Sequence, residues 1–324
     1  MNASLKAAKD QVHGDLIAGR NIGVVGVGID PGGGGGSGSL ELFYSDRILA
    51  DAIVFNINEN FGVRVNPRAG EIPVLPLGWL VLANRGVRDF FGNLMHPQLS
   101  GRLDPASPVT LLPRMKICQQ GQEAGRLGCF VKLADGSVHA LTARHLFTDD
   151  SAEIHSFDGF RAKDKIGNSL KLSSLNSVNS SECARFKPIP GAVFLGDNKI
   201  SGGFIPDKTD MSVIEGKKVR CLSSGAVGVV LEIEGTIMYP LPASPSARKL
   251  FDLQVFVKNA GAAAFGGPGD SGSLVVLEEK AGSFNVGDAI GLYTWASGMQ
   301  KYHFVTPFYD CVSQLGIVSI PNPP

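Results

Sequence analysis

The residue with the clearest chemical potential is a serine in a glycine-rich turn. Ser271 stands in Gly269-Asp270-Ser271-Gly272, and the apolar run 274–277 follows it. A serine hydroxyl becomes a nucleophile when a base takes its proton and fixed N–H groups hold the oxyanion. Gly269 permits a turn in which the amides of Gly269 and Ser271 point at one spot. The segment therefore predicts a nucleophile with an oxyanion hole beside it.

A histidine and an aspartate precede this serine in the chain. His145 follows the strand-like run 138–142, and the ordinary pKa of histidine suits it to carry a proton near neutrality. Asp210 leads into the apolar run 211–214, and it is predicted to orient the imidazole. Asp207 and Asp197 are alternatives for that role. The order His, Asp, Ser differs from the orders of subtilisin and the α/β-hydrolases.

Two of these segments resemble a known family. Thr142-Ala143-Arg144-His145 and Gly269-Asp270-Ser271-Gly272 look like the paired T-A-x-H and G-D-S-G motifs of the chymotrypsin family, and residues 291–296 are similar to its G-I-V-S-W-G strand. The resemblance covers about residues 120–316. It implies a serine endopeptidase with two six-stranded β-barrels and the active site in the cleft between them.

The resemblance also implies substrate contacts. Thr294 would hydrogen-bond near the catalytic carboxylate, and the backbone of Trp295 would pair with the substrate as an antiparallel strand. Phe265 stands where digestive proteases place a residue at the floor of the specificity pocket. An apolar or small residue is therefore expected before the scissile bond.

A narrower branch of the family is also suggested. Phe204-Ile205-Pro206 before Asp210, and Lys218-Val219-Arg220 with the glycines that follow, are similar to trypsin-like proteins related to plant narrow-leaf. Bacterial members of that branch carry a β-rich region ahead of the barrels. Residues 20–115 are expected to correspond to it.

Asp270 needs a partner of its own, because a buried unpaired carboxylate is costly. Secreted relatives pair the equivalent aspartate with a newly cut N-terminus. This sequence shows no clear activation site ahead of the first barrel, so an internal side chain or backbone amides are expected to bind Asp270. Activity is then expected without N-terminal cleavage.

The pattern of short runs favours a mainly β fold of barrels or a sandwich, and the resemblance implies a chymotrypsin-like double β-barrel with an N-terminal β-rich extension. Short apolar runs separated by glycine turns recur after residue 115. The predicted division is an N-terminal domain at 1–115 with a leading helix over 4–18, a protease domain at 116–316 and a tail at 317–324. Residues 22–29, 40–44, 52–57 and 72–82 are predicted strands, and 309–316 a C-terminal helix.

Composition sets limits on partners. Lys plus Arg and Asp plus Glu both number 30, which gives no general attraction to nucleic acid or an anionic membrane. The sequence has no apolar run of membrane-spanning length and no secretory signal, so a cytoplasmic location is expected. The five cysteines lack metal-binding spacing and are expected to be reduced and mostly buried.

No metal or cofactor is expected, and the expected partner is a protein or peptide substrate. Formation of a homo-oligomer is left open. Two other functions also remain open on the same fold: a non-catalytic binding scaffold and an ester hydrolase.

Overall fold

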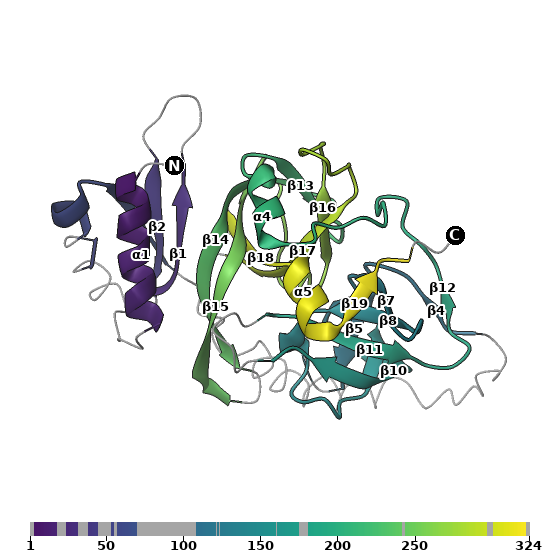
Figure 1. The fold of residues 1–324 in the computed structure, drawn as a ribbon. Coiled ribbons are helices and arrows are strands. Elements are labelled where there is room, and N and C mark those ends of the chain that lie inside the picture. The colour runs from purple at the N-terminus through teal and green to yellow at the C-terminus, as the bar shows by residue number, and fades with distance from the viewer. Residues whose placement is uncertain are drawn as a thin grey trace.

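A computed structural model describes residues 3–17, 24–31, 38–44, 53–54, 57–69, 108–120, 122, 124–159, 161–174, 181–241, 244–296 and 301–321. Figure 1 shows three parts along the chain: an N-terminal helix and sheet, a first β unit, and a second β unit that lies between the other two. The mainly β fold with an N-terminal β-rich extension is confirmed.

In the N-terminal part, helix α1 packs on three strands. The elements are α1 (Ala3–Ile17), β1 (Val24–Asp30), β2 (Ser39–Tyr44) and β3 (Arg64–Ala69). Residues at helical spacing on α1, among them Leu5, Val12 and Leu16, are buried against Ile29 and Leu40 of the sheet. The predicted leading helix is confirmed, because its apolar side has a sheet to cover.

The second β unit is a closed barrel of six strands. They are β13 (Lys218–Cys221), β14 (Val227–Leu241), β15 (Ser244–Asn259), β16 (Leu274–Leu277), β17 (Ala289–Ala296) and β18 (Tyr302–Pro307). The order β13-β16-β17-β18-β15-β14 closes through pairing of β13 with β14. Beyond β14 the same sheet continues into β1, β2 and β3. The N-terminal strands are thus hydrogen-bonded to this barrel.

The first β unit is an eight-stranded antiparallel sheet in the order β19-β7-β8-β11-β10-β9-β5-β6. Its strands are β5 (Lys116–Gln119), β6 (Ala124–Arg126), β7 (Cys129–Leu133), β8 (Val138–Thr142), β9 (Ile154–Phe157), β10 (Ala162–Leu172), β11 (Ala184–Pro188) and β19 (Ile317–Ser319). Six strands were predicted, and eight are found. Residues 317–319, placed in the tail by the sequence, form β19 and pair with β7.

A shared core joins the two β units. It contains Leu141 of the first unit, Leu274 and Leu292 of the second, and Phe308 and Leu315 of α5 (Phe308–Leu315). The C-terminal helix predicted at 309–316 is therefore confirmed. It packs between the units, as Figure 1 shows, and ends at Gly316 with a left-handed cap at φ 69°.

Two predicted strands are wrong. Of residues 52–57, Ile53, Val54 and Ile57 are helical. Residues 211–214 belong to two short helical turns, α4 (Lys208–Met211) and η2 (Ser212–Ile214). The side chain of Asp207 accepts a hydrogen bond from the backbone N–H of Asp210, so it caps α4 and starts a helix where alternation favoured a strand. The predicted strand at 72–82 lies outside the described residues.

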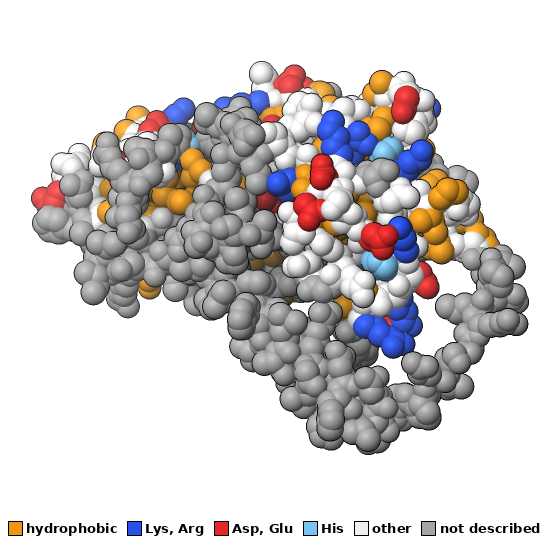
Figure 2. Space-filling model, turned by 90° about the horizontal axis from the view of Figure 1, so that it is seen from below, with side chains coloured by type: hydrophobic (Ala, Val, Ile, Leu, Met, Phe, Trp, Pro, Cys, Tyr) orange, Lys and Arg blue, Asp and Glu red, His pale blue; other side chains and the backbone are white. Residues whose placement is uncertain are grey.

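Two short strands form a separate two-stranded sheet. β4 (Thr110–Leu111) and β12 (Val193–Phe194) pair in parallel. The face shown in Figure 2 carries charged side chains of both signs, interspersed over its described part. None of the helices in the described ranges is long and apolar enough to cross a membrane.

A buried histidine makes fold stability sensitive to acid. His139 in β8 is 6% exposed, and its Nδ1 accepts a hydrogen bond from Arg185 Nη1 at 2.9 Å. Burial, with the charge of Arg185, lowers the pKa of His139 from 6.5 to about 4. The unfolded chain therefore binds this proton at higher pH than the folded chain does. The resulting stability is present above pH 6.5 and is lost as the pH falls toward 4.

Replacing this histidine should flatten that dependence. His139→Gln keeps an acceptor for Arg185 but cannot take a proton, so the free energy of unfolding should fall less steeply between pH 6.5 and 4. The difference in slope should approach about 1.4 kcal/mol per pH unit. Urea unfolding of both proteins across this range measures it, and parallel slopes would show that His139 is not the sensitive group.

Candidate active site

The predicted base forms a carboxylate–histidine pair. His145 lies in the short turn η1 (Arg144–Leu146) directly after β8. Its Nδ1 is 2.8 Å from Oε2 of Glu182, and its backbone N–H donates to the same oxygen at 3.1 Å. The side chain of Glu182 is 3% exposed, and that of His145 is 18% exposed. Because a carboxylate accepts, a neutral imidazole here would carry its proton on Nδ1 and its lone pair on Nε2.

Strand register brings this glutamate to the histidine. Glu182 precedes β11, which pairs with β8 so that Ala184 lies opposite Thr142. Arg144 stands two residues after Thr142, and Glu182 stands two residues before Ala184. The backbone N–H of Arg144 donates to the carbonyl of Glu182 at 3.3 Å. Ser173 secures the segment, because its hydroxyl contacts the carbonyl of Ser181 and accepts from the backbone N–H of Cys183.

Asp210, which the sequence predicted to orient His145, is not the carboxylate on Nδ1. It lies in α4 of the second unit, where its backbone N–H bonds to Asp207. The alternatives are also engaged elsewhere: Asp207 caps α4, and buried Asp197 pairs with Arg114 at 2.8 Å. This differs from the expectation because α4 is not a strand ending at the imidazole, whereas β11 runs beside β8.

Among the described residues, two amides of the turn around Ser271 donate to no acceptor. Asp270, Gly272 and Ser273 donate their backbone N–H groups to Gly267, Tyr293 and Asp270 respectively. Within the described residues no acceptor is found for the amides of Gly269 and Ser271. Gly269 has φ 84°, a conformation that glycine adopts without strain. These two amides are the ones that the sequence predicted for an oxyanion hole.

The serine turn packs directly on the strand that leads to His145. Gly272 has φ 88°, and a Cβ there would lie 2.3 Å from Thr142 Oγ1 and 2.9 Å from the nitrogen of Ala143. A Cβ on Gly125 would lie 2.4 Å from the side chain of Leu146 and 2.6 Å from the carbonyl of Ser271. Gly125 of β6 therefore lies between the Leu146 side chain and the serine turn, where a larger residue would not fit. The close packing brings the two motifs together.

Asp270 has internal partners, as the sequence predicted. Its Oδ2 accepts from the backbone N–H of Gly267 at 3.1 Å, and its Oδ1 is 3.4 Å from Nη2 of Arg126. The backbone of Arg126 also donates to the carbonyl of Ser271 at 2.8 Å and accepts from Thr142 Oγ1 at 2.6 Å. Arg126 thus links the serine turn to the strand before His145.

Loss of this arginine side chain should impair turnover more than binding. Arg126→Met removes the ion pair with Asp270 and leaves the backbone contacts, so the amides of Gly269 and Ser271 should be less well fixed. For the peptidase that the sequence predicts, we expect kcat to fall about tenfold to a hundredfold, below the loss for a deleted oxyanion donor, with KM nearly unchanged. Peptide hydrolysis kinetics measure both constants.

Two controls accompany this variant. Arg126→Lys should recover part of kcat, because the positive charge remains. Arg220→Met breaks an ion pair with Glu278 elsewhere on the second barrel and should leave kcat within about twofold. Equal losses in Arg126→Met and Arg220→Met would show that ion pairing in general, and not the serine turn, is responsible.

The three residues predicted to contact substrate are buried in the second β unit. Phe265 is fully buried and its ring centroid lies 5.4 Å from that of His303. The hydroxyl of Thr294 donates to the carbonyl of Phe304 at 3.1 Å, and in the described residues it bonds to no carboxylate. Trp295 is 7% exposed and packs on Phe304. A substrate role for these residues stays a prediction.

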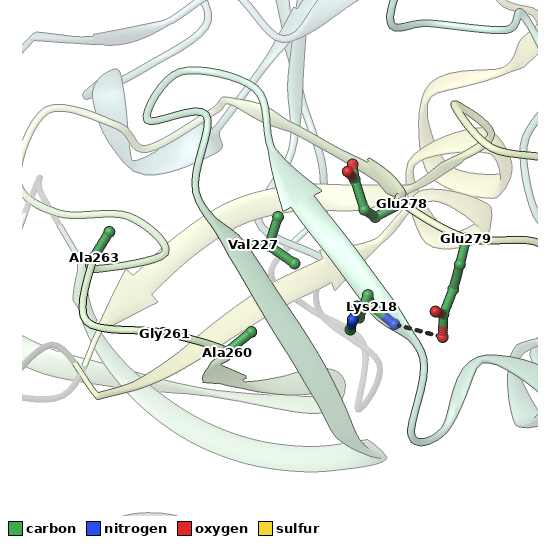
Figure 3. A pocket seen from close by; sticks show the side chains of 7 residues that line it. All are labelled: Lys218, Val227, Ala260, Gly261, Ala263, Glu278 and Glu279. Atoms are coloured by element: carbon green, nitrogen blue, oxygen red, sulfur yellow. Dashed lines mark hydrogen bonds between the residues drawn. The ribbon is translucent and has the colours of Figure 1, made fainter.

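A cavity of about 530 Å³ lies on the second barrel. It is lined by Lys218, Val227, Ala260, Gly261, Ala263, Glu278 and Glu279. Figure 3 shows the backbone nitrogen of Lys218 bonded to Glu279, at 3.2 Å. The lining includes neither His145 nor Ser271. Among the described residues no cluster of His, Cys, Asp or Glu could hold a metal ion.

Comparison with known proteins gives only distant similarity. No protein-family model matches the chain, and no curated protein does. Among solved structures, a Nocardiopsis protease is 12% identical with a TM-score of 0.44, covering 66% of this chain and 100% of its own. The murine norovirus NS6 protease is 12% identical with a TM-score of 0.33, covering 59% and 91%.

A third solved structure, the Vibrio cholerae VesB protease, is 12% identical with a TM-score of 0.30, and the match covers 60% of each chain. All three are proteases. The functional conclusion for this chain has to come from its own residues.

Proposed function

We propose that the chain is a serine endopeptidase on a chymotrypsin-like double β-barrel, with Ser271 as nucleophile, His145 as base and Glu182 as the orienting carboxylate. The observation that carries this proposal is the 2.8 Å pairing of His145 Nδ1 with buried Glu182, beside a serine turn that packs on the same strand. The protonated Nδ1 leaves Nε2 as the group that can receive a proton.

The proposed reaction is acyl transfer in two stages. Ser271 Oγ attacks a peptide carbonyl carbon while His145 Nε2 takes its proton, and the amides of Gly269 and Ser271 hold the oxyanion. His145 then gives the proton to the leaving amine as the C–N bond breaks. Water, with its proton passing to His145, hydrolyses the resulting ester and restores Ser271. Glu182 stabilises the charged imidazole throughout.

Serine rather than cysteine is favoured as the nucleophile. All five cysteines fall within the described residues, all are buried, and no disulfide joins them. Burial raises the pKa of the Cys129 and Cys311 thiols, which disfavours the reactive thiolate. The expectation that the cysteines are mostly buried is confirmed.

Peptide and ester substrates separate this function from its alternatives. The full chain is incubated with a proteome-derived peptide library and, separately, with lipid and small activated esters. New peptide N-termini that are absent with Ser271→Ala support the peptidase. Hydrolysis of lipid esters without peptide cleavage would support an ester hydrolase. Binding of library peptides without cleavage of either substrate would support a non-catalytic scaffold.

A further inference from the structure

One end of β17 continues past its neighbour β16. The pairing of β16 with β17 begins at Leu274 opposite Leu292, and Tyr293 then bonds to Gly272 and Ser273 of the serine turn. Trp295 pairs with Phe304 of β18 on the other side. Within the described residues, no strand pairs with the stretch from Trp295 to Ala296 on the side of the serine turn. An extended peptide could add there.

The side chain of Trp295 is held by the N-terminal part of the chain. Its ring centroid lies 5.7 Å from that of Phe43 in β2, with the rings at 81° to one another. Phe43 is fully buried and makes similar edge-on contacts with Phe256, Tyr302 and Phe304. It is the one ring of this cluster that the N-terminal part supplies among the described residues. Such edge-on pairs stabilise beyond the area they bury.

Further contacts fix the N-terminal part to the barrel. β1 pairs with β14, Lys9 of α1 forms a buried ion pair with Glu232, and Asp30 pairs with Lys258 at 2.7 Å. Burial raises the pKa of Glu232, against the opposing effect of the Lys9 ammonium. A Cβ on Gly28 of β1 would lie 2.7 Å from the ring of Phe256. The two parts are packed without spare room at this point.

We infer that the N-terminal part completes the substrate-binding strand: Phe43 is a positioning residue that holds Trp295, and thereby sets the edge of β17 to which an extended peptide adds. This inference rests on the proposed peptidase function. It assigns the N-terminal sheet to substrate recognition. Phe43 touches neither the predicted nucleophile nor the base, so its loss should weaken peptide binding and spare the reactivity of Ser271.

The test compares a long and a short reactant on Phe43→Leu in the full chain. The long reactant is the peptide that the wild type cleaves fastest in a proteome-derived library, and the short one is a fluorophosphonate, which needs no strand pairing. KM for the peptide should rise about tenfold, while the rate of fluorophosphonate labelling stays within about twofold. Phe130→Leu, a buried ring of the first unit that packs on Phe194, is the matched control and should change neither quantity.

A second variant keeps the test decisive if Phe43→Leu folds poorly. Trp295→Phe retains an aromatic ring, and thermal unfolding reports whether each variant is folded. KM should rise in Trp295→Phe, and its combination with Phe43→Leu should add less than the sum of the single effects. Unchanged KM in folded Phe43→Leu or Trp295→Phe would overturn the inference and leave the peptidase standing. Absence of labelling and of cleavage in the wild type would instead overturn the proposed function.

Discussion

Ser271→Ala should lower kcat for peptide hydrolysis by about 10⁴- to 10⁶-fold, and His145→Ala should do nearly the same. The serine and its base act as one unit, so the double variant should be little worse than either single variant. His145 lies in a turn that follows buried β8, Ser271 lies in a turn that precedes buried β16, and neither substitution removes a core side chain. Circular dichroism and thermal unfolding should therefore match the wild type.

Ser273→Ala is the matched control for the nucleophile. Ser273 lies two residues along the same turn, but its hydroxyl is buried and accepts from the backbone N–H of Ser223 at 2.9 Å. It faces the barrel interior, so its loss should reduce stability by about 1 kcal/mol and leave kcat within about fivefold. If Ser273→Ala abolished cleavage while Ser271→Ala retained it, the nucleophile would have been misassigned.

Glu182→Gln should lower kcat by about 10³- to 10⁴-fold, the second largest effect expected. The amide can still contact the imidazole and the backbone of His145, but it no longer bears the charge that stabilises the imidazolium. The neutral side chain can also donate to Nδ1 and favour the tautomer with its proton on Nε2, the nitrogen that should accept from Ser271. Steady-state kinetics on a cleaved peptide measure the loss.

Asp210→Asn is the matched control for the carboxylate. Asp210 is held by its backbone to Asp207 in α4, so this change should leave kcat within about twofold. The reverse pattern, with activity lost in Asp210→Asn and kept in Glu182→Gln, would return the orienting role to Asp210. The two substitutions are chemically alike, so each controls for the loss of one negative charge.

The serine and histidine segments could be predicted because their signals are local. Glycines on both sides of Ser271 and the buried strand 138–142 before His145 are visible in a short window of sequence. Gly269 and Gly272 both have positive φ, which is the physical reason for glycine at these positions. The strands β8 and β16 were predicted at their observed bounds because their apolar runs are also local signals.

The carboxylate could not be predicted in this way. Glu182 reaches His145 only through the register of β11 against β8, a contact between segments that are distant in sequence. In the sequence it stands in the polar run Ser180-Ser181-Glu182, which is typical of a solvated loop. The available signal was the short alternating run 184–188 that follows it, which forms β11.

The attachment of the N-terminal strands was equally hidden. Composition and periodicity predict that β1 and β2 are strands, but they do not say which edge the strands join. Long β14 provides that edge, and Phe43 then meets the aromatic side chains of the barrel. The pairing of β1 with β14 and the packing of Phe43 on the barrel both depend on contacts between segments that are distant in sequence.

The central claim, that Ser271 is a nucleophile activated by His145 and Glu182, is tested most directly by mapping a covalent adduct. Full-length protein, with its N-terminus verified by intact mass, is treated with a fluorophosphonate and digested for tandem mass spectrometry. The account predicts one adduct on Ser271, formed without prior cleavage of the chain, much slower in His145→Ala and Glu182→Gln and unchanged in Asp210→Asn. An adduct on another residue, or labelling of Ser271 at the same rate in His145→Ala, would contradict it.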